Sequence, residues 1–174
     1  MKKVIKGSIG DIQKQLDNYL KEYFNKLEQF ENQLANYGIS VAQANTGGFG
    51  SKILFSIDTN PQEDGCSMLI RAVDSSKIYS VWQTKDGVKT AEVSPLLMAE
   101  FGSGKYADNP KRIEGVGRGT FLGQKHAFNE EGWYWLDLNN VWHHSSGIVP
   151  KMPMYKASQE MEDNASRIAS EVFG

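Results

Sequence analysis

A long apolar stripe near the N-terminus constrains this chain more than any other feature of its sequence. Between residues 9 and 37, apolar side chains recur every three or four residues, at Ile9, Ile12, Leu16, Leu20, Tyr23, Leu27, Phe30, Leu34 and Tyr37. This spacing places them on one face of an α-helix. Ser8 and Asp11 predict a capping box at its start, and Gly38 predicts its end, because glycine adopts the left-handed conformation without a clash.

The predicted helix over 8–37 is about 45 Å long at about 1.5 Å per residue. That length matches the width of a small domain, and helices in proteins depend on packing for their stability. Either the rest of the chain covers the whole stripe, or another subunit covers the remainder.

Short segments rich in β-branched and aromatic residues follow, separated by Gly, Pro, Asn and Asp. They span 39–45, 52–58, 67–73 and 78–84. Short connections favour antiparallel neighbours, so we expect a meander. Alternation in the second segment puts Ile53, Phe55 and Ile57 on the core face. Pro95 then opens a short helix that we expect to reach Phe101, which completes a strand and helix region over 39–101.

Residues 102–128 predict a loop, because they contain six glycines and almost no apolar periodicity. A loop of this length in a compact domain is usually functional or disordered. It carries five basic residues against Asp108 and Glu114, a net charge of +3 in a chain of −2: Lys105, Lys111, Arg112, Arg118 and Lys125. We expect it to contact an acidic partner surface or DNA phosphates, with a solvated loop as the alternative.

Three of the four tryptophans lie in the aromatic region 133–144, at Trp133, Trp135 and Trp142. A strand over 133–138 has apolar side chains on both faces, so one face can meet the core and the other must meet a helix or another chain. Asn139 and Asn140 predict a turn before a returning strand. Pro153 opens a final helix over 153–173, whose apolar stripe is Met154, Ala157, Met161, Ala165, Ile168 and Val172.

These elements predict one α+β domain over residues 1–174, with a mainly antiparallel sheet of about five or six strands between a long N-terminal helix and a C-terminal helix. The net charge of −2 gives no global attraction to nucleic acid or membranes. Cys66 is the single cysteine, so no internal disulfide can form. Because no signal-peptide core or membrane-length apolar run is present, we expect a chain that is neither secreted nor membrane-embedded.

Several segments imitate chemical motifs without completing them. Residues 102–105 read Gly-Ser-Gly-Lys, but the earlier glycine and the following Ser or Thr of a phosphate-binding loop are missing. His143 and His144 are adjacent on a predicted strand, where side chains point to opposite faces, so they do not easily share one metal. We expect no catalytic residue, metal or cofactor. A small metal-dependent nuclease or hydrolase built on Asn140, His143 and His144 is the alternative from another class.

Three segments together carry a family resemblance. Residues 99–104 read Ala-Glu-Phe-Gly-Ser-Gly, residues 132–135 read Gly-Trp-Tyr-Trp, and Gly147-Ile148-Val149-Pro150 precedes Pro153-Met154-Tyr155. In this order they resemble the minor tail-component, or tail-completion, proteins of long-tailed phages. The likeness covers roughly the C-terminal half, together with the N-terminal helix. The aromatic strand and the long middle loop depart from shorter members of that family.

The resemblance implies a structural virion protein rather than an enzyme. Such proteins act as tail-completion or tail-terminator components at the head–tail neck, and they are assembled in the bacterial cytoplasm. Copies form a ring, often a hexamer, between the head-side connector or stopper and the tail tube, where passing DNA offers a non-specific contact and no membrane is involved. A head-closure or other neck connector role is the alternative. The interface residues expected on this basis are Glu100, Phe101, Lys105, Arg112, Arg118, Trp133 and Trp135.

Overall fold

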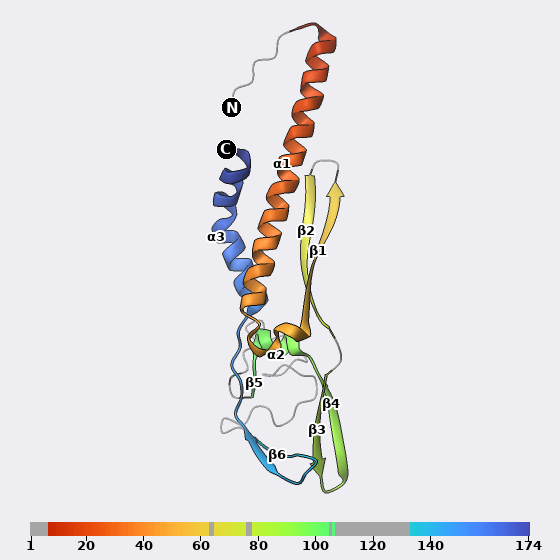
Figure 1. Ribbon diagram of the computed structural model, residues 1–174, viewed down its shortest axis with the longest axis vertical. Coiled ribbons are helices and arrows are strands. Elements are labelled where there is room, and N and C mark those ends of the chain that lie inside the picture. The colour runs from red at the N-terminus through yellow and green to blue at the C-terminus, as the bar shows by residue number, and fades with distance from the viewer. Residues whose placement is uncertain (1–6, 63–64, 76–77, 105, 107–132) are drawn as a thin grey trace, which may run out of the picture.

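The computed structural model describes residues 7–62, 65–75, 78–104, 106 and 133–174 (Figure 1). The helices are α1 (Ile9–Ala44), α2 (Pro95–Phe101) and α3 (Pro153–Phe173), and a 3-10 helix η1 (Gly47–Lys52) follows α1. The strands are β1 (Ile53–Gln62), β2 (Gly65–Asp74), β3 (Ile78–Thr84), β4 (Gly87–Val93), β5 (Ser103–Gly104), β6 (Trp133–Leu136), β7 (Trp142–Ser145) and β8 (Gly147–Ile148). The expected α+β class is confirmed, but the strands are more numerous than expected and form separate sheets.

The predicted start of α1 is confirmed in detail. The hydroxyl oxygen of Ser8 accepts a hydrogen bond from the backbone N–H of Asp11, and the Asp11 carboxylate accepts one from the backbone N–H of Ser8 at 3.1 Å. This reciprocal pair satisfies two of the backbone donors that a helix start leaves free.

The predicted end of this helix at Gly38 is wrong, and so is the strand expected over 39–45. The helix continues through Gly38 to Ala44. Gly38 is buried, and a Cβ at this position would overlap the side chains of Met161 in α3 and Ile70 in β2. Glycine is needed here for close packing rather than for a turn. Asn45 caps the end of the helix, and its side-chain amide donates to the carbonyl oxygen of Val41 at 2.8 Å.

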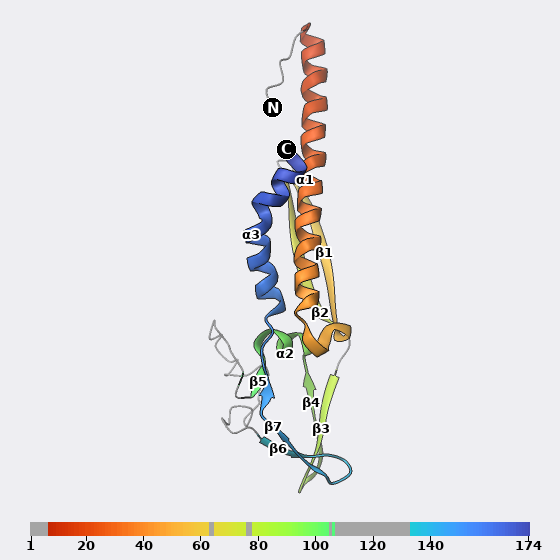
Figure 2. The same cartoon turned by 60° about the vertical axis from the view of Figure 1, so that its left-hand side comes forward.

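Three layers make up the upper part of the molecule: the β1–β2 hairpin, α1, and α3 (Figures 1 and 2). The hairpin contains ten antiparallel residue pairs, from Ile53 opposite Asp74 to the pair at its tip. The predicted core face is confirmed, since Ile53 is buried and Phe55 and Ile57 are half-buried. The buried apolar core of the described part is small and consists mostly of small side chains, namely Ala35, Ala42, Ile53, Ala99, Ala157 and Ile168, together with Pro95 and Pro153.

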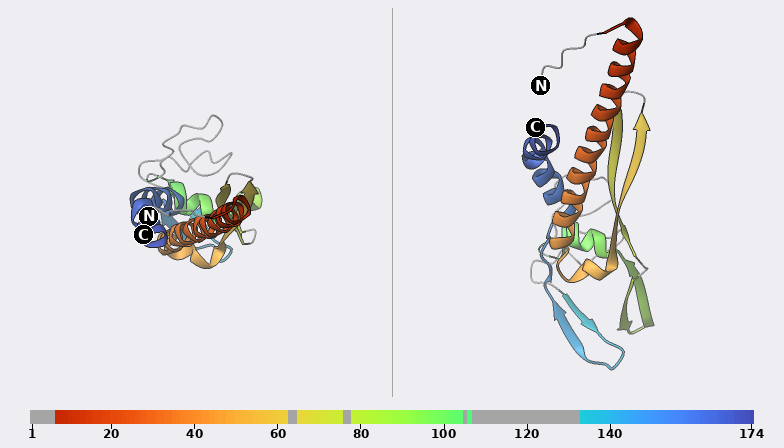
Figure 3. Two further views of the ribbon diagram at one scale, coloured as in Figure 1. Left: turned by 90° about the horizontal axis from the view of Figure 1, so that it is seen from above. Right: turned by 45° about the horizontal axis from the view of Figure 1, so that its top comes forward.

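A four-stranded antiparallel sheet forms the opposite end of the molecule from the start of α1 (Figure 3). Its strand order is β4-β3-β6-β7, and its two hairpins meet through Gln83 opposite Leu136. Strand β4 was not expected from the sequence. The turn expected at Asn139 and Asn140 is confirmed, as are the helices that begin at Pro95 and Pro153. The molecule is therefore elongated, with a helical end and a sheet end.

Candidate assembly surfaces

Residues 99–104, at the end of α2, and residues 147–155, which lead into α3, lie against each other although they are distant in sequence. The carbonyl oxygen of Ala99 accepts hydrogen bonds from the backbone N–H groups of Lys151 and Met152, at 2.8 and 3.1 Å. Ala99 is completely buried. The end of α2 is thereby fixed against the chain that leads into α3. We call residues 99–104 and 147–155 the motif junction.

Glu100 caps α3 from another element. Its two carboxylate oxygens accept the backbone N–H groups of Met154 at 2.9 Å and Tyr155 at 3.0 Å. Met152, the residue before α3, has a left-handed backbone and gives no side-chain cap. The carboxylate therefore satisfies free donors and places negative charge at the positive end of the helix dipole. The structure thus places Glu100 at an internal contact of the fold.

Gly102 and Ser103 complete the motif junction. Gly102 has a φ of 70°, and a Cβ there would overlap the carbonyl oxygen of Ile148. Ser103 is buried, and its hydroxyl oxygen accepts the backbone N–H of Ile148 at 3.1 Å. β5 and β8 pair at the same place. A glycine and a small hydroxyl residue are required because the two chains approach so closely.

The other expected interface residues are only partly described. Phe101 is half-buried at the end of α2. Lys105, Arg112 and Arg118 lie outside the described residues, as does most of the loop expected over 102–128, whose start is the short strand β5. The backbones of Trp133 and Trp135 lie in β6, and their side chains are outside the described part.

The β1–β2 hairpin offers two open sheet edges. Within the described ranges, β1 pairs only with β2, so the outer main-chain groups of both strands have no neighbouring strand. On the face away from α1, Leu54 lies opposite Val73 and both are exposed. Arg71 and Asp58 form an ion pair at 2.6 Å on this face, which contributes little because both side chains are about half exposed. Open edges of this length are templates for pairing with another chain.

The first part of α1 extends beyond the rest of the body (Figures 1 and 2). The ring of Phe173, at the end of α3, lies 6.0 Å from the ring of Tyr23 and 6.3 Å from that of Phe30. N-terminal to Tyr23, the stripe is exposed. We call residues 9–24 the α1 overhang; its exposed apolar residues are Ile9, Ile12, Leu16, Tyr19, Leu20, Tyr23 and Phe24.

The β6–β7 hairpin carries a second exposed apolar surface at the sheet end. Tyr134 and Trp142 are 69% and 67% exposed. The ring of Tyr134 lies 4.7 Å from that of His144, its cross-strand neighbour. Exposed aromatic groups of this kind are typical anchors of protein interfaces. One face of the predicted aromatic strand is therefore exposed.

His143 belongs to a turn that Asp137 organises. The Asp137 carboxylate contacts the Nε2 atom of His143 at 3.0 Å and accepts the backbone N–H groups of Asn139 and Val141 at 2.8 and 2.9 Å. The contact with His143, followed by the hydrogen bond from Val141, lowers the pKa of the Asp137 carboxyl below its ordinary value of 3.8. The described residues include no cluster of three or more His, Cys, Asp or Glu side chains suited to a metal ion.

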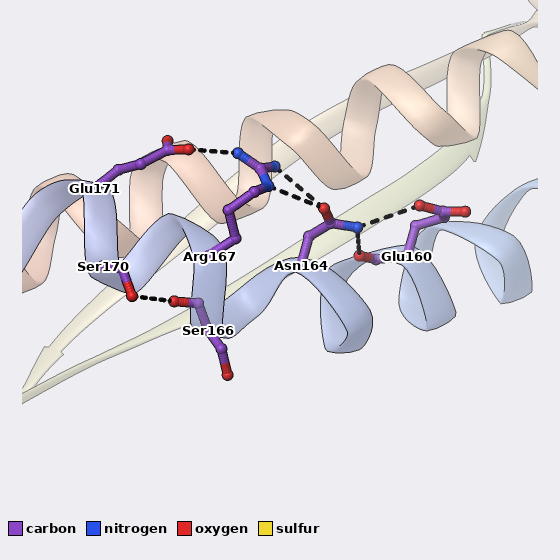
Figure 4. Close-up of polar contacts among 6 residues, drawn as sticks. All are labelled: Glu160, Asn164, Ser166, Arg167, Ser170 and Glu171. Atoms are coloured by element: carbon purple, nitrogen blue, oxygen red, sulfur yellow. Dashed lines mark hydrogen bonds and ion pairs between the residues drawn. The ribbon is translucent and has the colours of Figure 1, made fainter.

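A series of polar contacts runs along α3, in contrast to the apolar α1 overhang (Figure 4). Arg167 pairs with Glu171 at 2.7 Å and donates to the side-chain oxygen of Asn164 at 3.2 Å. Glu160 accepts the hydroxyl of Tyr37 at 3.0 Å, which raises the pKa of Tyr37. Among the helices described, none is long and apolar enough to cross a membrane.

A scan against models of protein families, a search of curated proteins and a search of solved structures each found no match. Function has therefore to be inferred from the chain's own residues and geometry.

Proposed function

We propose that this chain is a structural virion protein that completes the tail at the head–tail neck of a long-tailed phage. It works by joining copies of itself into a ring and by binding neighbouring virion proteins. The three segments that resemble tail-completion proteins support this proposal, as does the contact between two of them in the motif junction. In this junction, hydrogen bonds fix the positions of α2, α3 and strand β5 relative to one another.

The main support for assembly into a ring comes from the two open edges of the β1–β2 hairpin. Each strand is ten residues long, which corresponds to about 33 Å at about 3.3 Å per residue. The edge of β1 on one copy can pair with the edge of β2 on the next, which adds strands across the subunit boundary. Because the two edges are different surfaces, this contact is heterologous, and repeating it closes a ring when the rotation allows.

Exposed apolar surfaces at both ends of the molecule support a position between two different neighbours. The α1 overhang lies at the helical end, and Tyr134 and Trp142 lie at the sheet end. A ring of such subunits would present different chemistry on its two faces, one for the head-side connector or stopper and one for the tail tube. Lys105, Arg112 and Arg118 are proposed to add positive charge facing an acidic partner or passing DNA.

Deleting the gene from the phage genome that encodes it tests the role. Electron microscopy of the lysate should show filled heads and separate tails, and purified protein should restore joining. Heads that lose their DNA beside normal tails would instead assign the protein to head closure. Joined, infectious virions from the deletion would overturn a neck role altogether.

A further inference from the structure

We propose that two copies of this chain associate through the α1 overhang, which packs antiparallel on the same segment of the second copy about a twofold axis at Leu16. The pairing concerns the free chain, goes beyond the proposed neck role and does not depend on it; in the neck, the overhang would exchange the second copy for a neighbouring virion protein. Three independent observations lead to it: the spacing of the stripe, the position of α3, and the amount of exposed apolar surface.

The spacing of the stripe reads the same in both directions. Its residues are Ile9, Ile12, Leu16, Leu20 and Tyr23, with steps of three, four, four and three residues. Fourteen residues in four steps give a mean step of 3.5, the repeat of helices that pack along one another. In an antiparallel pair, Ile9 faces Tyr23 of the second copy, Ile12 faces Leu20, and Leu16 faces itself. Each of the five stripe residues thus meets an apolar residue, and Tyr19 and Phe24 lie at the sides of the contact.

The position of α3 favours the antiparallel orientation. Phe173 packs on Tyr23, the last stripe residue of the overhang, and on Phe30, so α3 occupies the same face of α1 from the end of the overhang onward. A parallel partner helix that followed the stripe would run into α3. An antiparallel partner has its own start, Ile9, at the level of Tyr23, and its body lies beyond the opposite end of the overhang. The overhang is about 24 Å long, for sixteen residues at about 1.5 Å each, which matches the length of the same segment of the second copy.

The exposed apolar surface is large enough for a specific contact. Large apolar and aromatic side chains offer on the order of 200 Å² each when fully accessible. The seven residues of the overhang are 40–87% exposed. Together they present roughly 700 Å² per copy, close to the ~800 Å² per partner of a standard interface. The opposite side of the same helix is polar, with Lys14, Asn18 and Lys21.

Leu16→Glu in the full chain tests the pairing, because it places two like charges face to face at the twofold axis. Asn18→Glu is the matched control, since two residues further along the helix the side chain points to the opposite side. Native mass spectrometry and sedimentation should show that Leu16→Glu halves the mass of the wild-type assembly and weakens association at least tenfold. Asn18→Glu should leave both unchanged, and circular dichroism should show equal helix content in all three proteins.

Leu16→Glu should halve the mass whether the wild-type chain forms dimers or two rings joined through the overhang. The test of the pairing is therefore separate from the test of the ring. A wild-type dimer without rings would count against the neck role alone. A monomeric wild-type protein at tens of micromolar, or a mass unchanged by Leu16→Glu, would overturn the pairing and leave the stripe to a different partner.

A short bifunctional maleimide tests the orientation in a Cys66→Ser background. Chains carrying Ile12→Cys mixed with chains carrying Leu20→Cys should cross-link to each other, because these positions face one another only in the antiparallel pair. Ile12→Cys alone should not cross-link to itself. Self-linking of Ile12→Cys at the efficiency of the mixture would show a parallel pair and overturn the proposal.

Discussion

The carboxylate of Glu100, in the last turn of α2, accepts the backbone N–H of Met154, in the first turn of α3, at 2.9 Å across 54 residues of sequence. With its second oxygen, which accepts the N–H of Tyr155, Glu100 closes the start of α3 from outside that helix. The two ends of the segment between Glu100 and Met154 are therefore held next to each other. Glu100, which we expected at an interface with a partner, thus joins two helices of the chain's own fold.

Replacing Glu100 should destabilise the fold through α3. Glu100→Ala leaves the N–H groups of Met154 and Tyr155 without their acceptors, so we expect the free energy of unfolding to fall by about 1–2 kcal/mol, the usual effect of losing an N-terminal cap. Glu100→Gln retains a side-chain acceptor and should lose less. Chemical denaturation measures both, with Glu162→Ala on the exposed face of α3 as the control. Equal stability of Glu100→Ala and the control would contradict the capping role.

Alanine substitutions at two glycines of α1 should have opposite effects. Gly38→Ala would overlap Met161 and Ile70, so we expect a loss of about 1–3 kcal/mol from overpacking, despite the better helix propensity of alanine. Nothing lies within 4 Å of a Cβ at Gly10, so Gly10→Ala should stabilise the helix by up to about 1 kcal/mol. Thermal denaturation compares them. Recovery of Gly38→Ala stability by the added change Met161→Ala would locate the clash, and equal gains at both glycines would refute it.

Acid should loosen the β6–β7 turn. The contact with His143 and the backbone hydrogen bonds hold the pKa of Asp137 below 3.8 in the folded chain. A lowered carboxyl pKa contributes stability that is present above the unfolded value and is lost as the pH falls through the folded value. Carboxyl NMR titration should therefore show Asp137 ionising below pH 3.8, and His143→Ala should move that pKa upward. An unchanged titration in His143→Ala would exclude His143 as the main cause.

Blocking one open edge of the hairpin should prevent ring closure without unfolding the chain. Adjacent N–H groups of a strand point to opposite edges, so of Thr59→Pro and Asn60→Pro only one removes an outward donor and keeps the hairpin. The variant that retains the wild-type circular dichroism spectrum should form no closed rings in electron microscopy and native mass spectrometry. Rings of unchanged mass from that variant would assign ring contacts to another surface.

Features decided by neighbours in sequence could be predicted from the sequence. The capping box of Ser8 and Asp11 and the helix from Pro95 to Phe101 depend on hydrogen bonds or backbone angles within one turn, and Pro153 marks the start of the last helix through its fixed backbone angle. The polar strand β4 was missed because its stability comes from pairing with β3 rather than from its own apolar pattern.

The sequence by itself determined the α+β class, the long amphipathic helix and the place of its cap, because spacing and capping act over a few residues. Only the tertiary structure decided that Gly38 lies inside a helix, that Glu100 caps α3, and that the apolar stripe of α1 extends beyond α3 and the β1–β2 hairpin. Each of these depends on groups brought together from distant parts of the chain, and local preferences carry no information about such approaches.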